Sequence, residues 1–289
     1  MVTLENEFLK VIIRNKGAEI ISFYNKRTAI EHLWQGDPDI WEWHAPNLFP
    51  VVGGNINNQI VIDGKNYEMP RHGFARHTEF TLLEQDELSA KFSMSHNENT
   101  ILIYPYKFAF QIIYTLKDST LHILYKVINY DDQSIYFSLG AHPAFNIPFF
   151  KNESKEDYYL EFEQDEPLIS HLLSPNGFFN GDTETLSQSG NTLPITENMF
   201  ANDALVFKDL VSRKVTLKSN NHLNSLYIEY PGFNYLGIWA KNGAPFICLE
   251  PWLGCADTEG KKCEIRKKEG IHKLDKGHVF EAFFNIGIT

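Results

Sequence analysis

The stretch "FAFQIIYTLKDSTLHILYKVINYDDQSIYFSLG", from Phe108 to Gly140, decides the fold class. It holds three runs rich in β-branched and aromatic residues, and the polar segments "KDST" and "NYDDQ" separate them. Runs of this kind favour extended backbone, and the polar segments carry the residues that form turns. The pattern predicts a meander of three consecutive antiparallel strands between residues 107 and 139.

Two other segments carry the same signal. In "NQIVIDGKNYEM", Asp63-Gly64 stands between two extended runs, which is the strongest short-range indication of a hairpin. The C-terminal run "VFEAFFNIGI" alternates, so that Glu281 and Asn285 fall on one face of a strand and apolar residues on the other. The predicted apolar face holds Phe280, Ala282, Phe284, Ile286 and Ile288.

The rest of the chain repeats short β-type runs, more than a dozen in all, without βα alternation and without a Gly-rich phosphate loop. We therefore predict an all-β fold, a large antiparallel β-sandwich of two packed sheets, with residues 1–289 forming a single domain. The polar stretch at 174–199, "SPNGFFNGDTETLSQSGNTLPITENM", is expected to be a long loop that covers a binding site.

Composition and charge exclude several classes of function. The chain has 289 residues, 43% hydrophobic and 22% charged, with a formal net charge of -11. Such an acidic chain lacks the cationic surface that nucleic acid or an anionic membrane requires. There is no basic leader and no apolar run of membrane length, so we expect a cytoplasmic protein. The cysteines, at 248, 255 and 263, lack CxxC spacing and no HExxH motif occurs, so neither a disulfide framework nor a metal site is predicted.

Two motifs, "SLGAHPAFNIP" and "PFICLEPWLG", place His142 and Glu250 at the end of an apolar run and directly before a proline. Proline disfavours helical backbone for the residue before it, so both side chains should project from a strand end. A histidine titrates near neutrality and burial raises the pKa of a carboxyl group, so the two could act as an acid/base pair. A hydrogen-bonded core histidine and a structural ion-pair carboxylate are the alternatives. The matching proline contexts support the catalytic interpretation.

Four segments, "PRHGFAR", "GAHPAFNIP", "NDALVF" and "EPWLG", occur in this order and at this spacing in the aldose 1-epimerase superfamily. The sequence resembles that superfamily, and within it the LacX-like branch of galactose mutarotase-like proteins, from "LFPVVG" at residue 48 to "EPWLGCADT" at residue 250. The resemblance implies a β-sandwich of the supersandwich type, no cofactor, and interconversion of the α and β anomers of a hexose. It implies Glu250 as catalytic base, His142 as acid and His72 as a second active-site histidine. Asp203 matches an aspartate that binds sugar hydroxyls.

The residue types suit this chemistry. Ring opening needs a base that takes the proton of the C1 hydroxyl and an acid that protonates the ring oxygen, and one carboxylate with one imidazole supplies both. Glycoside hydrolysis usually needs two carboxyl groups, and only Glu250 is obvious in the sequence. Trp239 and Trp252 could offer apolar faces to the sugar, although large aromatic residues more often belong to the core.

The segment "MPRHGFARH", residues 69–77, concentrates histidine and arginine in an otherwise acidic chain. Given the resemblance, it should include the polar wall of the sugar pocket. We expect His72 and Arg76 to line the pocket, with Arg71 as a further candidate. His77 would lie on a solvated edge, because on a regular strand its odd separation from His72 places the two on opposite faces.

One departure from the family affects the substrate. Where relatives usually have Gly-Arg after the "FP" motif, this chain reads "FPVVGGNINN", with Gly54 in the place of the arginine. A charged hydrogen bond contributes roughly 1.5 to 3 kcal/mol, so its loss could weaken sugar binding by one to two orders of magnitude or signal another sugar. Arg71 or Arg76 could compensate.

Three functional hypotheses follow from the sequence. The first is a mutarotase acting on a free aldohexose such as galactose or glucose, as a monomer or homodimer. The second is a hexose-6-phosphate mutarotase, in which arginines would bind the phosphate. The third is a sugar-binding or regulatory protein of the same fold without catalysis, which the presence of both His142 and Glu250 argues against.

Overall fold

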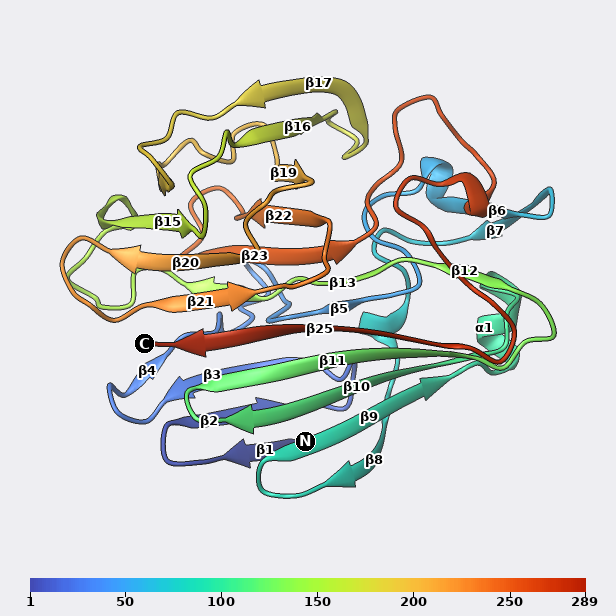
Figure 1. The fold of residues 1–289 in the computed structure, drawn as a ribbon, viewed down its shortest axis with the longest axis horizontal. Coiled ribbons are helices and arrows are strands. Elements are labelled where there is room, and N and C mark those ends of the chain that lie inside the picture. The colour runs from blue at the N-terminus through green and yellow to red at the C-terminus, as the bar shows by residue number, and fades with distance from the viewer.

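The computed structural model describes all residues 1–289 and consists of 25 short strands, one α-helix and four 3₁₀ helices. Two large antiparallel sheets dominate the structure (Figure 1). The nine-stranded sheet contains, in spatial order, β18 (Thr192–Pro194), β15 (Tyr158–Phe162), β20 (Lys214–Ser219), β21 (Leu226–Glu229), β25 (Val279–Ile288), β11 (Thr120–Asn129), β10 (Phe108–Lys117), β9 (Ser89–Ser95) and β8 (Thr81–Gln85).

The eight-stranded sheet carries most of the residues discussed below. Its order is β17 (Phe179–Thr185), β16 (Ile169–Leu173), β19 (Leu205–Lys208), β22 (Tyr235–Trp239), β23 (Phe246–Leu253), β13 (Leu139–Ala141) and β5 (Asn47–Leu48), and β14 (Ala144–Asn146) also pairs with β23. In Figure 1 this sheet lies above the long strands β25, β11 and β10.

The remaining elements are small. One four-stranded sheet contains β1 (Val2–Glu5), β2 (Leu9–Ile13), β3 (Ile20–Asn25) and β4 (Ile30–Glu31), and two-stranded sheets pair β6 (Gln59–Ile62) with β7 (Lys65–Glu68) and β12 (Ile135–Phe137) with β24 (His272–Leu274). The helices are α1 (Glu98–Ile103), η1 (Ile56–Asn58), η2 (Ala75–His77), η3 (Lys155–Asp157) and η4 (Ile265–Lys267). None of them has the length and hydropathy of a membrane-crossing helix.

The core lies between the two large sheets and is strongly aromatic. Phe110 on β10 stacks on Phe49, which follows β5, with ring centroids 4.6 Å apart. Tyr125 on β11 packs against Phe110, with ring centroids 5.5 Å apart. The same core cluster contains residues from Val2 to Ile288. The all-β class and the antiparallel packing are therefore as predicted.

The predicted hairpin and C-terminal strand are also confirmed. β6 and β7 pair around Asp63-Gly64, and both turn residues have positive φ, 49° and 75°, as a tight hairpin of this type requires. In β25, Phe284, Ile286 and Ile288 are buried, and the half-buried Phe280 and Ala282 pack against the core.

The predicted three-stranded meander is only partly correct. β10 and β11 form the expected antiparallel pair, but β25 takes the other edge of β11. The third run instead divides into β12 and β13, which pair with other strands. Asn129 explains the change of direction, because its side-chain amide donates to the carbonyls of Gln133 and Leu274 and ties the "NYDDQ" segment to β24. The chain thus crosses to the other sheet, where β13 leads directly to His142.

The stretch at 174–199 is not the long loop that we expected. It contains β17, which pairs with β16, and β18, which pairs with β15. Phe179 helps to hold this segment in place, because its ring is buried in one cluster with Val206 and Trp252 on the outer face of the eight-stranded sheet. The segment still borders the pocket described below, through Gly177 and Phe179.

One buried histidine makes stability depend on pH. His32 is 1% exposed, and neither ring nitrogen has a hydrogen-bond partner. Burial, and to a lesser extent His222, lowers its pKa to about 4. An unfolded His32 binds a proton below about pH 6.5, whereas the folded one does so only near pH 4, so folding stability falls as the pH drops between these values.

We expect His32→Leu to remove this component. Urea unfolding at pH 8 and pH 4 should show that the wild type loses roughly 3 kcal/mol more than the variant over this interval. His278→Gln, at an exposed site, is the matched control and should leave the pH dependence unchanged. Equal losses in the wild type and His32→Leu would show that His32 is not the source.

Candidate active site

The candidate site lies on the outer face of the eight-stranded sheet, not between the two sheets. Along β23, Ile247 and Leu249 point into the main core, whereas the alternate residues Cys248, Glu250 and Trp252 face the other side. All residues of this strand are buried. The alternation therefore places a carboxyl group on a water-poor surface next to an indole.

We predicted Glu250 at a strand end, but it lies inside β23. The strand tolerates the proline that follows Glu250 because the strand pairing on that side of β23 is interrupted between β13 and β14. The Leu249 N–H donates to the carbonyl of Pro143 between the pairing segments of β13 and β14. The nitrogen of Pro251, two residues later, faces the same edge, so its missing N–H removes little of the ladder.

His142 follows β13 directly, as predicted, and its ring faces Glu250. The Nε2 atom of His142 lies 3.2 Å from Oε2 of Glu250, and the two side chains are only 11% and 1% exposed. Trp41 stacks on the imidazole with ring centroids 5.1 Å apart and an interplanar angle of 29°. Trp239 meets the same ring edge-on at 5.8 Å. The His142 ring is thus held between two indoles.

Burial shifts the two pKa values of this pair in opposite directions. It raises the pKa of Glu250 well above the ordinary value, and the negative charge of Asp203 adds to the effect. Burial, followed by the positive charge of Arg76, lowers the pKa of His142 to about 3. Both shifts favour the uncharged forms. In these uncharged forms the pair carries one titratable proton, on Glu250.

His72 is held in a strained backbone conformation that aims its ring at this pair. Its φ is 67°, which is uncommon for a residue with a side chain, and strain of this kind often occurs at functional sites. The His72 N–H donates to the carbonyl of Gly53, and the Gly53 N–H donates to Nδ1 of His72. Because Nδ1 accepts a hydrogen bond, the neutral ring carries its proton on Nε2. Burial keeps it neutral by lowering its pKa well below 6.5.

The two arginines of the same segment lie at the edge of the pocket. Arg76 lies over the Trp43 ring at 5.2 Å and donates to the carbonyl of Arg71. Arg71 is exposed and donates to the carbonyl of Asn176, across the pocket rim. Neither guanidinium forms an ion pair with a carboxylate. His77 is exposed, as predicted, although it lies at the end of η2 and not on a strand.

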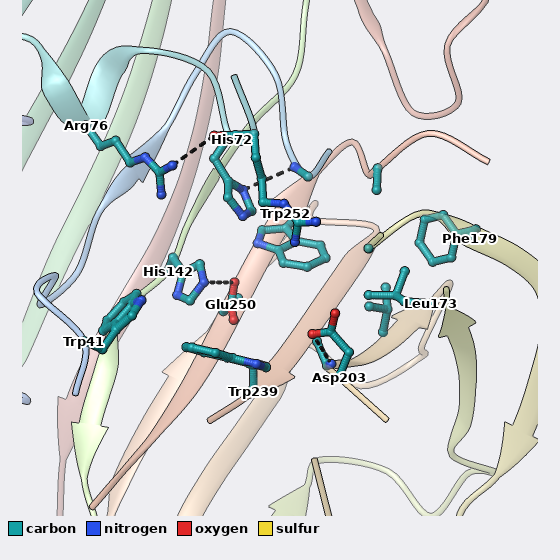
Figure 2. Close-up of a pocket in the computed structure, with 16 residues that line it drawn as sticks. Trp41, His72, Arg76, His142, Leu173, Phe179, Asp203, Trp239, Glu250 and Trp252 are labelled. Carbon is teal, nitrogen blue, oxygen red and sulfur yellow. Dashed lines mark hydrogen bonds and ion pairs between the residues drawn. The ribbon is translucent and has the colours of Figure 1, made fainter. Parts of the chain in front are cut away.

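One pocket of about 370 Å³ brings together eight residues singled out from the sequence: Arg71, His72, Arg76, His142, Asp203, Trp239, Glu250 and Trp252. A pocket of this size suits a small ligand. Figure 2 shows Arg76 and His72 on one side of the His142–Glu250 pair and Asp203 on the other. Asp203 also has positive φ, 79°, and its carboxylate accepts the N–H of Ala204, which fixes its position.

Several lining residues carry no sequence signal that would identify them. Trp41, Leu173, Phe179 and Val206 contribute apolar walls beside Trp252, which the sequence did indicate. The indole of Trp252 lies over Gly237, where a Cβ atom would come within 2.6 Å of the ring. Gly237 is the cross-strand partner of Glu250, so the missing side chain leaves room for the indole beside the carboxyl group.

Gly54 occupies a position with little free space. A Cβ atom there would approach the Phe178 ring to 3.1 Å, so a longer side chain requires that ring to move. Gly53, and not Gly54, lines the pocket. The positively charged side chains of this site therefore come from the segment at 69–77.

Comparison with known proteins identifies the family. Residues 1–264 match the family model described as aldose 1-epimerase. The chain belongs to the aldose 1-epimerase family. It is 34% identical over 284 residues to a protein of Lactococcus lactis subsp. lactis named "Protein LacX, plasmid", with 94% of each chain covered.

Two solved structures of family members are similar over the full chain. A galactose mutarotase related enzyme from Lactobacillus acidophilus superposes with a TM-score of 0.95 at 31% identity, covering 100% of this chain and 97% of that one. A galactose mutarotase-like protein from Lactobacillus casei gives a TM-score of 0.94 at 32% identity, with 100% of both chains covered. The protein therefore has the galactose mutarotase-like fold, as the sequence resemblance implied.

Proposed function

We propose that this family member is an aldose 1-epimerase that interconverts the α and β anomers of an aldohexose. The observation that carries the proposal is the separation of 3.2 Å between Nε2 of His142 and Oε2 of Glu250 inside a pocket with aromatic walls. An acid and a base at this distance can reach two neighbouring oxygens of one sugar, the C1 hydroxyl and the ring oxygen.

The proposed reaction exchanges two protons between the sugar and the pair, one taken up by Glu250 and one given by His142. Transfer of the Glu250 proton to His142 first converts the uncharged pair into a carboxylate and an imidazolium. Glu250 then removes the proton from the C1 hydroxyl, while His142 donates its proton to the ring oxygen. The C1–O5 bond breaks and an open-chain aldehyde forms. Rotation about C1–C2 exposes the other face of the aldehyde, and the same two transfers run in reverse. The pair changes from carboxylate and imidazolium to carboxylic acid and imidazole, so its net charge is unchanged.

Other residues of the pocket would position the sugar. The Nε2–H of His72 can donate to a sugar oxygen, and the Asp203 carboxylate can accept from sugar hydroxyls. The faces of Trp239 and Trp252 suit the apolar C–H surface of a pyranose ring. Burial of Glu250 makes its carboxylate a stronger base, which favours proton removal from a hydroxyl.

Polarimetry tests the proposal directly. Freshly dissolved α-glucose and α-galactose should reach anomeric equilibrium faster with purified protein than in the same buffer alone. Sugar binding should be followed in parallel by tryptophan fluorescence, since Trp41, Trp239 and Trp252 line the pocket. Binding without any acceleration, for these sugars and for glucose 6-phosphate, would instead support a sugar-binding protein without catalysis.

A phosphorylated substrate is a second candidate, and the uncompensated arginines favour it. In an aldopyranose, C6 is attached to C5, which is bonded to the ring oxygen. If His142 protonates that oxygen, a 6-phosphate extends toward the residues beside His142, and Arg76 lies on that side of the pair (Figure 2). A guanidinium binds phosphate well because it offers paired N–H donors.

Arg76→Ala should therefore raise KM more than it lowers kcat. If phosphate binds there, the rise in KM should be far larger for glucose 6-phosphate than for glucose, since a charged hydrogen bond contributes roughly 1.5 to 3 kcal/mol, or one to two orders of magnitude in affinity. Arg266→Ala, away from this pocket, is the matched control. Equal KM changes for both sugars would exclude phosphate binding by Arg76.

A further inference from the structure

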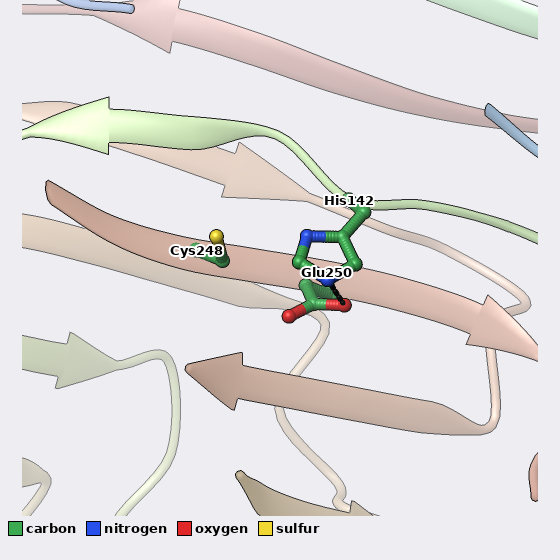
Figure 3. A group of neighbouring side chains, drawn as sticks. All are labelled: His142, Cys248 and Glu250. Carbon is green, nitrogen blue, oxygen red and sulfur yellow. Dashed lines mark ion pairs between the residues drawn. The ribbon is translucent and has the colours of Figure 1, made fainter. Parts of the chain in front are cut away.

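A cysteine lies beside the proposed acid/base pair. Cys248 precedes Glu250 by two residues on β23, so the two side chains share one face of the strand. The thiol is fully buried, in a small apolar cluster with Trp34, Phe246 and three alanines. The ligand atoms of His142, Cys248 and Glu250 all lie within 4.8 Å of one another (Figure 3).

Two atoms of this cluster have lone pairs without partners. Nδ1 of His142 and Oε2 of Glu250 are buried and neither has a hydrogen-bond partner, although Nε2 of His142 lies 3.2 Å from Oε2. Most buried polar atoms in proteins are hydrogen-bonded. Figure 3 shows Nε2 of His142 facing Glu250 and the other ring nitrogen turned toward the Cys248 side. The cluster therefore offers unused nitrogen and oxygen donors next to a sulfur.

Sulfur, nitrogen and oxygen donors in this arrangement match the ligands that Zn²⁺ prefers. Zinc binds cysteine sulfur at about 2.3 Å and histidine nitrogen or carboxylate oxygen at about 2.0 to 2.2 Å, in tetrahedral geometry. These bond lengths separate the ligand atoms by roughly 3.3 to 3.6 Å. The three atoms of this cluster need only move closer by an ångström or so. Three protein ligands would leave a fourth position for water or another ligand.

We propose that His142, Cys248 and Glu250 bind one thiophilic divalent cation of the Zn²⁺ class, and that the bound ion inhibits the enzyme. On binding, the thiol proton of Cys248 passes to solvent and the thiolate forms a bond to the metal. The ion would occupy the lone pairs that proton transfer requires. Mg²⁺ should not bind, because it prefers oxygen ligands in octahedral geometry. Metal binding is independent of the proposed epimerase activity, whereas inhibition rests on it.

Co²⁺ provides a spectroscopic test on the full-length, metal-free wild-type protein. A cobalt–thiolate bond should give a near-ultraviolet charge-transfer band and tetrahedral absorption in the visible range, both saturating at one equivalent. Zn²⁺ should displace the Co²⁺ and abolish both signals, and Mg²⁺ should not. Absence of the thiolate band with Co²⁺ overturns the proposal, whatever the activity measurements show.

Variants identify the sulfur. Cys248→Ala should abolish the thiolate band. It should also weaken Zn²⁺ binding by more than roughly 10- to 100-fold, which is the usual loss in affinity when a residue that only hydrogen-bonds to a metal ligand is removed. Cys263→Ala, at a half-buried thiol elsewhere, is the matched control and should retain the band. A band that survives in Cys248→Ala, or disappears in Cys263→Ala, contradicts the assignment.

Inhibition is measured separately by polarimetry. One equivalent of bound Zn²⁺ should suppress the accelerated mutarotation of the wild type, and a chelator should restore it. If no sugar is turned over, the proposed function fails while the Co²⁺ spectrum still decides metal binding. Undiminished turnover with Zn²⁺ bound at Cys248 would overturn the inhibitory role.

Discussion

Glu250→Gln is expected to lower the enzymatic mutarotation rate by about 10² to 10⁴, with little loss of sugar binding. Glutamine keeps the shape of the side chain and its hydrogen-bonding capacity but has no basic oxygen. Glu250 is 1% exposed and is the carboxylate that faces His142. The loss should appear in kcat, because proton removal from the C1 hydroxyl belongs to the transition state.

The measurement combines polarimetry, corrected for spontaneous mutarotation, with tryptophan fluorescence for sugar affinity. Glu87→Gln, an exposed position remote from the pocket, is the matched control for loss of one negative charge. A Glu250→Gln protein with full activity would remove the base assignment and, with it, the main support for the proposed function. A variant that loses affinity as much as turnover would assign Glu250 to binding.

The sequence predicted the site residues better than it predicted their surroundings. The proline after His142 correctly indicated a strand end, because β13 stops at Ala141. The same argument was wrong for Glu250, which lies inside β23, because the local break between β13 and β14 accommodates Pro251. Proline restricts local backbone, but the neighbouring strands decide whether the strand continues.

Long-range pairing accounts for most of what could not be predicted. Nothing in the run "HILYKVIN" of β11 indicates whether its second edge pairs with the next strand in the sequence or with β25. β25 lies about 150 residues later in the chain and is the strand that pairs there. Likewise, Trp41 is one of several aromatic residues in "DIWEWHAP", and only the fold shows that it stacks on His142. The side-chain cluster of Cys248 depends on strand alternation together with the position of the loop after β13, so cysteine spacing alone could not indicate it.

The one-proton pair makes a specific prediction about pH. Because burial lowers the pKa of His142 to about 3 and raises that of Glu250, the pair keeps its single proton across the mildly acidic range. The wild-type kcat should therefore show no inflection near pH 6.5, where an ordinary histidine titrates. It should decline at high pH, when the proton is lost as the pH rises through the raised pKa of Glu250.

Replacing His142 should change both the rate and this pH profile. His142→Gln keeps an N–H donor near the position of Nε2 and His142→Asn shortens it, but neither amide can transfer a proton, so each should lower kcat by about 10² to 10⁴. The residual rate then depends on Glu250 alone as base. Since only its ionised form can accept a proton, residual activity should rise with pH through the raised pKa, opposite to the wild-type decline. His278→Gln, at an exposed histidine, should behave like the wild type. A His142→Gln protein with undiminished kcat, or with a residual rate that falls as the pH rises, would show that His142 and Glu250 do not share the proton on which the proposed ring opening depends.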